Sequence, residues 1–207
     1  MQTVNPNTNK TVKSFKKMTE KTVDAKVAKS HLAYANWKET NYQQRAYLLS
    51  KVAKLMRINK SELAKTITLE MGKLFSEAEG EIDLSADMID YYADNEEGFL
   101  ADKVLDLEYG EAIIRNSPIG VLLGVMPWNS PYYQVALFTA PNIMVGNTIL
   151  LKHPSIVPQC AAAIELDKTE VKLLPEAVTY STICKKTTIE HIKIHFRHTV
   201  NFTKSAY

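Results

Sequence analysis

The sequence predicts an α/β fold in which helices are followed by a short parallel sheet. Two apolar runs, residues 121–126 and 149–151, are bounded by turn residues, as in strands that are buried on both faces. Residues 133–145 between them are long enough for a crossover helix, so the unit is strand, helix, strand. Polar residues follow each run, and open parallel sheets bind ligands at that edge. A purely structural unit with a polar rim is the alternative, because a fold does not fix a function.

The composition is that of an ordinary globular chain. Its 207 residues, of which 45% are hydrophobic and 23% charged, allow one or two domains with a substantial core. A net charge of +2 gives no reason to expect nucleic acid or a membrane surface as a partner. No apolar run has membrane-spanning length, and the N-terminus lacks a secretory signal. The two cysteines form no CxxC pair, so we predict a cytoplasmic protein without a disulfide framework or a metal site.

The first hundred residues predict a strand pair followed by helices. Residues 2–4 and 11–15 are typical of strands joined by a turn, and helical composition begins at Lys16. Apolar residues then recur at helical spacing in four segments. The predicted buried faces are Val23, Val27, Leu32 and Ala35; Leu48, Val52, Leu55 and Met56; Leu63, Ile67 and Met71; and Ile82, Ala86, Ile89 and Ala93.

Helix boundaries and charges add further expectations for this part. Thr40 and Gln43 fit a capping box, while Gly72 and Gly98 are predicted to end helices. Acidic residues crowd the last of these helices, and we expect a solvated face rather than a catalytic carboxylate pair. They are Glu77, Glu79, Glu81, Asp83, Asp87, Asp90, Asp94, Glu96 and Glu97.

Residues 105–108 and 112–116 predict a hairpin around Tyr109-Gly110. An exposed edge strand of this kind would seek a partner.

The end of the chain predicts further alternation of helix and strand. Residues 158–166 predict a helix with Ala161 to Ile164 against the sheet, residues 188–194 another helix, and residues 200–203 a strand. Cys160 lies in the first of these helices, and Cys184 lies beside two lysines. We interpret both as ordinary thiols, because a reactive cysteine requires an accessible, electropositive site.

Several motifs resemble the NAD(P)-dependent aldehyde dehydrogenase superfamily, in particular its succinate-semialdehyde dehydrogenase type. They are Pro118-Ile119-Gly120-Val121, Met126-Pro127-Trp128-Asn129-Ser130-Pro131, Gly146-Asn147-Thr148 and Lys152-His153-Pro154-Ser155. The resemblance runs to about Glu165, becomes patchy beyond it, and covers less than half of a family-length chain. It implies N-terminal helices with an oligomerisation hairpin over residues 1–116, and a truncated Rossmann-like NAD(P)-binding region over residues 117–207. The two would pack as one cofactor-binding domain.

The resemblance also implies a reaction. In this family a cysteine thiolate attacks the aldehyde, the oxyanion is stabilised by fixed donors, hydride passes to the nicotinamide, and water releases the carboxylic acid. Asn129 matches the oxyanion-hole asparagine, a contribution of roughly 3–4 kcal/mol in a complete site. The alternative is a turn residue after Trp128.

Cofactor contacts follow from the same resemblance. Backbone groups of Met126, Pro127 and Trp128 would touch NADP or NAD, and Lys152 would reach the adenosine ribose. Ser155 stands where NAD-selective members often carry an acidic residue, so a 2′-phosphate is tolerated. Near the end of the chain, the matching cofactor-binding turn contains Ser205. There Lys204 replaces a glycine that permits close approach of the backbone.

The family's nucleophilic cysteine and general-base glutamate lie beyond the matching region. We therefore expect an inactive N-terminal fragment of an enzyme that oxidises a small aldehyde. Two alternatives stay open: an interaction protein that pairs with a full-length relative through the hairpin, forming a homo- or hetero-oligomer, and a cofactor-binding module without turnover.

Overall fold

The structure is a computed structural model that describes residues 2–165 and 178–181. Within them, two antiparallel pairs join β1 (Gln2–Asn5) with β2 (Lys10–Ser14) and β3 (Lys103–Leu105) with β4 (Ala112–Ile114). A parallel sheet has the order β5 (Val121–Val125), β6 (Thr148–Lys152), β7 (Val178–Ser181). The helices are α1 (Glu20–Trp37), α2 (Tyr42–Ile58), α3 (Lys60–Met71), α4 (Phe75–Leu100), α5 (Tyr133–Val145) and α6 (Pro158–Glu165). The predicted α/β class and its strand–helix–strand unit are confirmed, whereas the domain division at residue 117 stays a prediction.

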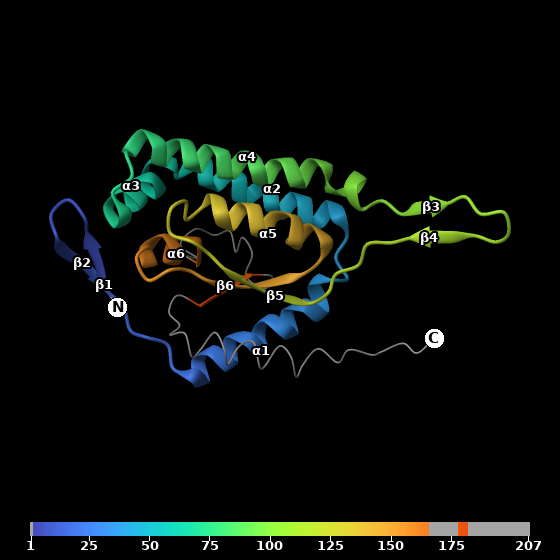
Figure 1. Cartoon of the computed structure of the whole chain (residues 1–207), viewed down its shortest axis with the longest axis horizontal. Helices are drawn as coiled ribbons and strands as arrows, with labels where there is room; N and C mark the ends of the chain where they lie inside the picture. The colour runs from blue at the N-terminus through green and yellow to red at the C-terminus, as the bar shows by residue number, and fades with distance from the viewer. Residues whose placement is uncertain (1, 166–177, 182–207) are drawn as a thin grey trace.

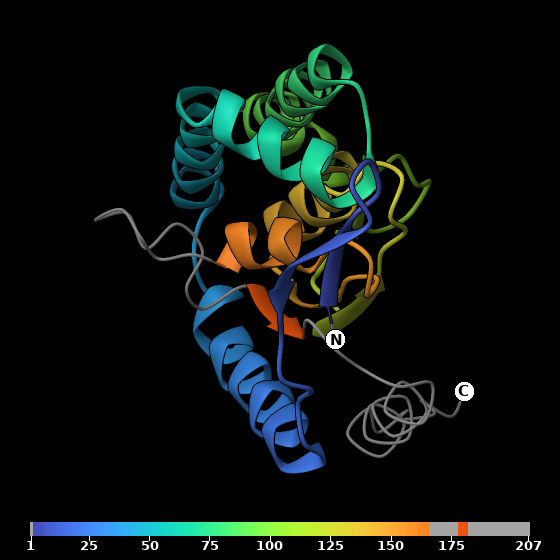
Figure 2. The same ribbon diagram turned by 90° about the vertical axis from the view of Figure 1, so that its left-hand side faces the viewer.

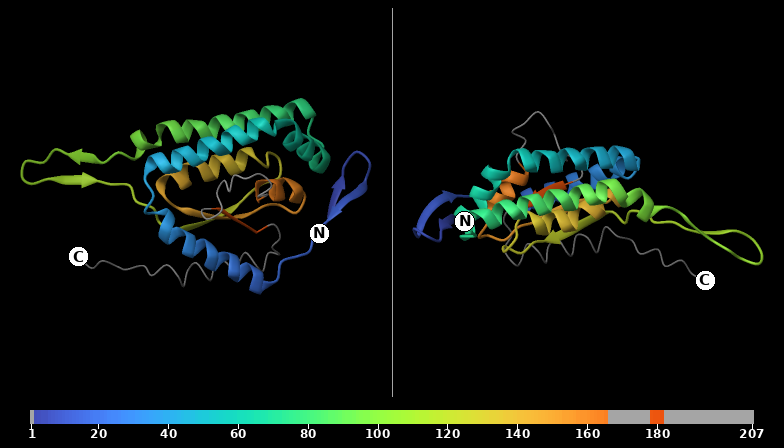
Figure 3. Two further views of the ribbon diagram at one scale, coloured as in Figure 1. Left: turned by 180° about the vertical axis from the view of Figure 1, so that it is seen from behind. Right: turned by 90° about the horizontal axis from the view of Figure 1, so that it is seen from above.

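The helices form layers around the parallel sheet. α1 lies across one face, in contact with all three strands, and α5 lies on the other face (Figure 1). α2 and α4 run side by side over α5, which they enclose against the sheet (Figures 1 and 3). The main core fills this enclosed region: Trp37, Leu49, Ala53, Ala86, Ile89, Ala93, Met126, Val135, Ala136, Ala140, Ile143, Met144, Ile149 and Leu151. None of the helices in the described ranges has the length and apolar character needed to span a membrane.

The β5–α5–β6 unit forms because its strands can be buried on both faces. Leu150 packs with Val23 and Val27 of α1, whereas Ile149 and Leu151 belong to the core on the α5 side. Successive side chains of a strand point to opposite faces, so this alternation places β6 between two helical layers. An uninterrupted apolar run is therefore what the strand requires.

The buried face that the sequence predicts for α1 is partly wrong. Leu32 is 72% exposed and Ala35 is also exposed, while Ser30 and Ala33 are buried instead. The reason is packing against β6: the Thr148 hydroxyl donates to the Ser30 carbonyl over 3.0 Å. The Ser30 hydroxyl donates to the Lys26 carbonyl within the helix over 3.0 Å, so this polar side chain has a partner in its buried position.

Two helix boundaries are also corrected. The capping box at the start of α2 is formed by Asn41 and Gln44, one residue later than predicted. Thr40 instead donates its hydroxyl to the Trp37 carbonyl over 2.6 Å. α4 passes through Gly98 and ends at Leu100, whereas α3 ends at the left-handed Gly72 as predicted.

The two hairpins project from opposite ends of the molecule (Figures 1 and 3). β1–β2 contacts α3, as the view in Figure 2 shows from that end. The predicted β3–β4 hairpin is present, but its first strand lies earlier than the predicted residues 105–108 and its second ends at Ile114 instead of Asn116. Apolar side chains such as Val104 and Ile113 are exposed.

α6 contacts α3 and the strand β7, which agrees with its predicted packing against the sheet. Its Cys160 also belongs to a buried cluster with Ala64 and Ile67 of α3 and Ala78 and Ile82 of α4.

Candidate active site and cofactor rim

The carboxyl ends of β5 and β6 form one rim of the parallel sheet. Val125 is paired with Lys152, and the Met126 amide donates to the Lys152 carbonyl over 3.0 Å. The loops that follow the two strands therefore begin side by side. The rim is at the end of the sheet nearer to α3 and the β1–β2 hairpin (Figure 1). Consecutive parallel strands thus bring both predicted motifs to the same edge.

The predicted site residues differ in exposure at this rim. Met126 is buried and Lys152 is half-buried. The remaining predicted residues in the described ranges are exposed, namely Pro127, Trp128, Asn129 and Ser155. With Trp128 50% exposed, an indole, an amide and a hydroxyl are accessible at one sheet edge together with an ammonium group. These groups can stack on a base, donate hydrogen bonds and attract phosphate.

The sequence predicts a solvated acidic face on α4, and for Glu81 this prediction is wrong. Its side chain is 4% exposed, and Oε1 accepts hydrogen bonds from the amides of Tyr132 (2.9 Å) and Tyr133 (3.3 Å). Its Oε2 forms an ion pair with Lys73, whose Nζ also lies 3.4 Å from the Ser130 hydroxyl. A carboxylate at the first amides of α5 suits the positive end of the helix dipole. The carboxylate therefore fixes the end of the loop that carries Asn129.

His153, which directly follows the neighbouring strand β6, fixes the same loop. Its ring is buried after β6, and Nε2 donates to the Pro131 carbonyl over 3.3 Å. Burial lowers the pKa of this imidazole, which keeps the ring neutral near pH 7. The bond joins the loop after β5 to the loop after β6.

Glu70 has a comparable role at α6. Its carboxylate accepts from the amides of Gln159 and Cys160, each over 2.8 Å, and from the Thr3 hydroxyl over 2.8 Å. Cys160 is buried, and burial raises the pKa of its thiol far above the usual range. The thiol is therefore protonated and inaccessible, in agreement with the prediction that it is not a nucleophile. Cys184, Lys204 and Ser205 lie outside the described residues.

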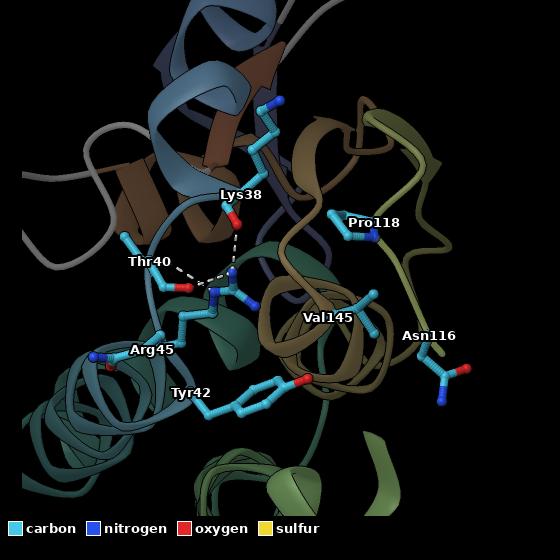
Figure 4. A pocket seen from close by; sticks show the side chains of 8 residues that line it. Lys38, Thr40, Tyr42, Arg45, Asn116, Pro118 and Val145 are labelled. Atoms are coloured by element: carbon cyan, nitrogen blue, oxygen red, sulfur yellow. Dashed lines mark hydrogen bonds between the residues drawn. The ribbon is translucent and has the colours of Figure 1, made fainter. Parts of the chain in front are cut away.

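A hollow of about 310 Å³ lies at the other end of the sheet, away from the rim. Its lining includes Tyr42, Pro118, Val145 and the side chain of Arg45, which points toward the carbonyl of Lys38 (Figure 4). The guanidinium donates to carbonyls of Met144, Trp37, Lys38 and Thr40 and to the Thr40 hydroxyl. These carbonyls are at the ends of α1 and α5, where a cation is favoured.

Arg45 is therefore a structural joint between three helices. Gly146 follows α5 with φ of +107°, and a Cβ atom there would lie 2.9 Å from Arg45 Nη2. Sequence reasoning did not identify Arg45, Glu70, Glu81 or His153 as anchors. Each of Arg45, Glu70 and Glu81 has at least one contact with a residue 51 to 99 positions away, and no local spacing signals such pairs.

Comparison with known proteins identifies the class. The aldehyde dehydrogenase family profile matches residues 1–203, and the chain belongs to this family.

Within this family, the chain is similar to succinate-semialdehyde dehydrogenases. Over 163 residues the chain is 45% identical to a succinate-semialdehyde dehydrogenase [NADP(+)] of Deinococcus radiodurans, covering 79% of this chain and 34% of that protein. It is 43% identical to succinate-semialdehyde dehydrogenase [NADP(+)] 1 of Mycobacterium tuberculosis over 77% of this chain and 35% of that protein. The succinic semialdehyde dehydrogenase of Streptococcus pyogenes, solved with NADP+, superposes with a TM-score of 0.85 at 35% identity, covering 92% of this chain and 42% of the other. The chain thus spans about a third of the length of these curated relatives.

Proposed function

We propose that this chain provides the adenosine-binding rim and the oxyanion donor of an NADP-dependent semialdehyde dehydrogenase. The observation that carries the proposal is the pairing of β5 with β6, which puts Trp128, Asn129 and Lys152 at one sheet edge. The similar proteins of D. radiodurans and M. tuberculosis are named as NADP-dependent succinate-semialdehyde dehydrogenases, which supports the cofactor and the substrate class. A cytoplasmic location is part of the proposal.

Each rim residue has a definite task in this proposal. NADP, when bound, accepts hydride from the substrate. The Lys152 ammonium donates hydrogen bonds to ribose hydroxyls, and the Ser155 hydroxyl tolerates a 2′-phosphate that a carboxylate would repel. The Asn129 amide donates a hydrogen bond to the oxygen of the aldehyde as negative charge develops on it.

We expect no turnover from this chain by itself. Aldehyde oxidation in this family needs a thiolate, and Cys160 is a buried, protonated thiol in α6. Cys184 is outside the described residues and beyond the part that resembles the family closely. Cofactor binding and catalysis are therefore separate questions for this chain.

Tryptophan fluorescence tests the cofactor site. The chain has two tryptophans, and only Trp128 is exposed at the rim, since Trp37 is buried with its indole N–H donating to the Ile143 carbonyl. We expect NADP to quench the emission in a saturable manner, and Trp128→Phe to abolish the response. Trp37→Phe is the matched control and keeps it.

Ser155→Glu sharpens the same titration. The added carboxylate should weaken NADP binding by about tenfold or more relative to NAD, because it lies near the 2′-phosphate. Absence of quenching at millimolar NADP, or quenching that persists in Trp128→Phe, contradicts the proposed site.

We also propose that the β3–β4 hairpin binds another protein chain. Its apolar side chains are exposed, with Val104 at 69% and Tyr109 at 86%, and it extends away from the helical body (Figures 1 and 3). Exposed apolar edge strands favour pairing with another chain, here a second copy or a full-length relative. Size-exclusion chromatography should show a complex that Val104→Lys dissociates, whereas a monomer at all concentrations and on mixing with a relative contradicts this proposal.

A further inference from the structure

The loop that carries Asn129 is fixed at both of its ends. At its start the Met126 amide is bound to Lys152, and near its end Pro131 accepts from His153. The last anchor comes from a distant part of the chain: Glu81 of α4 accepts from Tyr132 and Tyr133, 51 and 52 residues away.

Glu81 is also held in place on its other side. Lys73, in the turn between α3 and α4, pairs with its second carboxylate oxygen and reaches the Ser130 hydroxyl at 3.4 Å. Both side chains are largely buried, at 4% exposure for Glu81 and 15% for Lys73, so water competes weakly for the pair. The pair therefore binds the residue that directly follows Asn129 as well as the first amides of α5.

We infer that Glu81, held by Lys73, is a positioning residue: it fixes the backbone of the loop at Asn129, and thereby the side-chain amide of Asn129 at the cofactor rim. The inference rests on the proposed function of Asn129 for its catalytic meaning. An oxyanion donor contributes only if its orientation is set before the reaction, because reorganisation during the reaction would cost part of its stabilisation. Glu81 touches neither substrate nor cofactor in this account; it acts through the loop.

Glu70 offers a matched control inside the same fold. It is likewise a buried carboxylate that accepts from two amides at a helix start, but that helix is α6 and its loop does not contain Asn129. A general loss of stability should follow from either Glu70→Gln or Glu81→Gln. Loosening of Asn129 should follow only from Glu81→Gln.

The experiment is ¹⁵N relaxation of the full chain without cofactor, comparing wild type, E81Q and E70Q. We expect the order parameter of the Asn129 backbone amide to fall from about 0.85 to below about 0.6 in E81Q, the change from rigid to flexible backbone. E70Q should leave it at the wild-type value, although its urea midpoint falls to a similar extent. An unchanged value in E81Q, or an equal fall in E70Q, overturns the inference.

If E81Q does not fold, the variant Lys73→Met tests the same inference. This variant keeps the carboxylate bonds to Tyr132 and Tyr133 but removes the ion pair and the contact with Ser130. A reduced Asn129 order parameter supports the positioning network, and a wild-type value overturns it. Since no NADP is present, these outcomes are independent of whether the proposed cofactor binding holds.

Discussion

At the scale of single residues, burial separates acidic side chains that look alike in the sequence. Glu96 and Glu97 are neighbours in α4, but Glu96 is 4% exposed while Glu97 is exposed and accepts from Gln43 at 3.0 Å. One Glu96 carboxylate oxygen is buried without a hydrogen-bond donor among the described residues. Burial therefore raises the pKa of Glu96 to about 7.

This shift predicts a pH-dependent stability. Because the folded state holds the Glu96 proton up to about pH 7 and the unfolded state only to about 4.5, stability falls as pH rises between these values. Glu96→Gln stays neutral, so its Tm should exceed that of wild type by a margin that grows from pH 5 to pH 8. Glu97→Gln is the control and should show no such growth; a margin for Glu96→Gln that is independent of pH contradicts the shifted pKa.

At the scale of elements, the contact of β5 with α5 depends on a missing side chain. A Cβ atom at Gly124 would lie 2.7 Å from both Phe138 of α5 and Leu151 of β6. Gly124 thus permits close packing of the crossover helix on the sheet, directly before the Met126–Asn129 segment. The position of the rim depends on this contact.

Gly124→Ala should therefore destabilise the fold by about 1–3 kcal/mol in urea denaturation, as overpacking of a core does. Gly98→Ala in α4 is the matched control: nothing lies within 4 Å of an added Cβ, and the helix should gain about 0.5–1 kcal/mol. Equal effects of the two substitutions would refute the close packing.

Elements with strong local signals could be predicted from the sequence. The apolar run before Pro127, the 13-residue segment of α5 and the glycine after Met71 gave the right strand, helix and helix end. The face of α1 could not be predicted, since Ser30 is buried where its backbone carbonyl accepts from Thr148 of β6, while its hydroxyl donates to the Lys26 carbonyl within the helix. Gly98 did not end its helix, because glycine lowers helix stability without forbidding a helix that tertiary contacts hold.

At the scale of the whole molecule, the helical part and the sheet share one core. Trp37, Leu49 and Ala86 pack in the same cluster as Met126 and Leu151. The position of Asn129 at the rim could be predicted from strand order. Its anchors could not, because Glu81, Lys73 and His153 reach the loop across tertiary contacts that leave no pattern in the sequence.

The central claim is that the edge after β5 and β6 binds the adenosine end of NADP, and calorimetric titration with 2′,5′-ADP tests it most directly. The ligand 2′,5′-ADP lacks the nicotinamide, so its binding reports on the rim alone. We predict saturable binding that Lys152→Ala weakens by about tenfold to a hundredfold, the effect of losing hydrogen bonds from a charged group. Lys103→Ala, in the hairpin at the other end of the molecule, should leave the affinity unchanged. No binding at millimolar 2′,5′-ADP, or equal affinities of wild type and Lys152→Ala, would contradict the account.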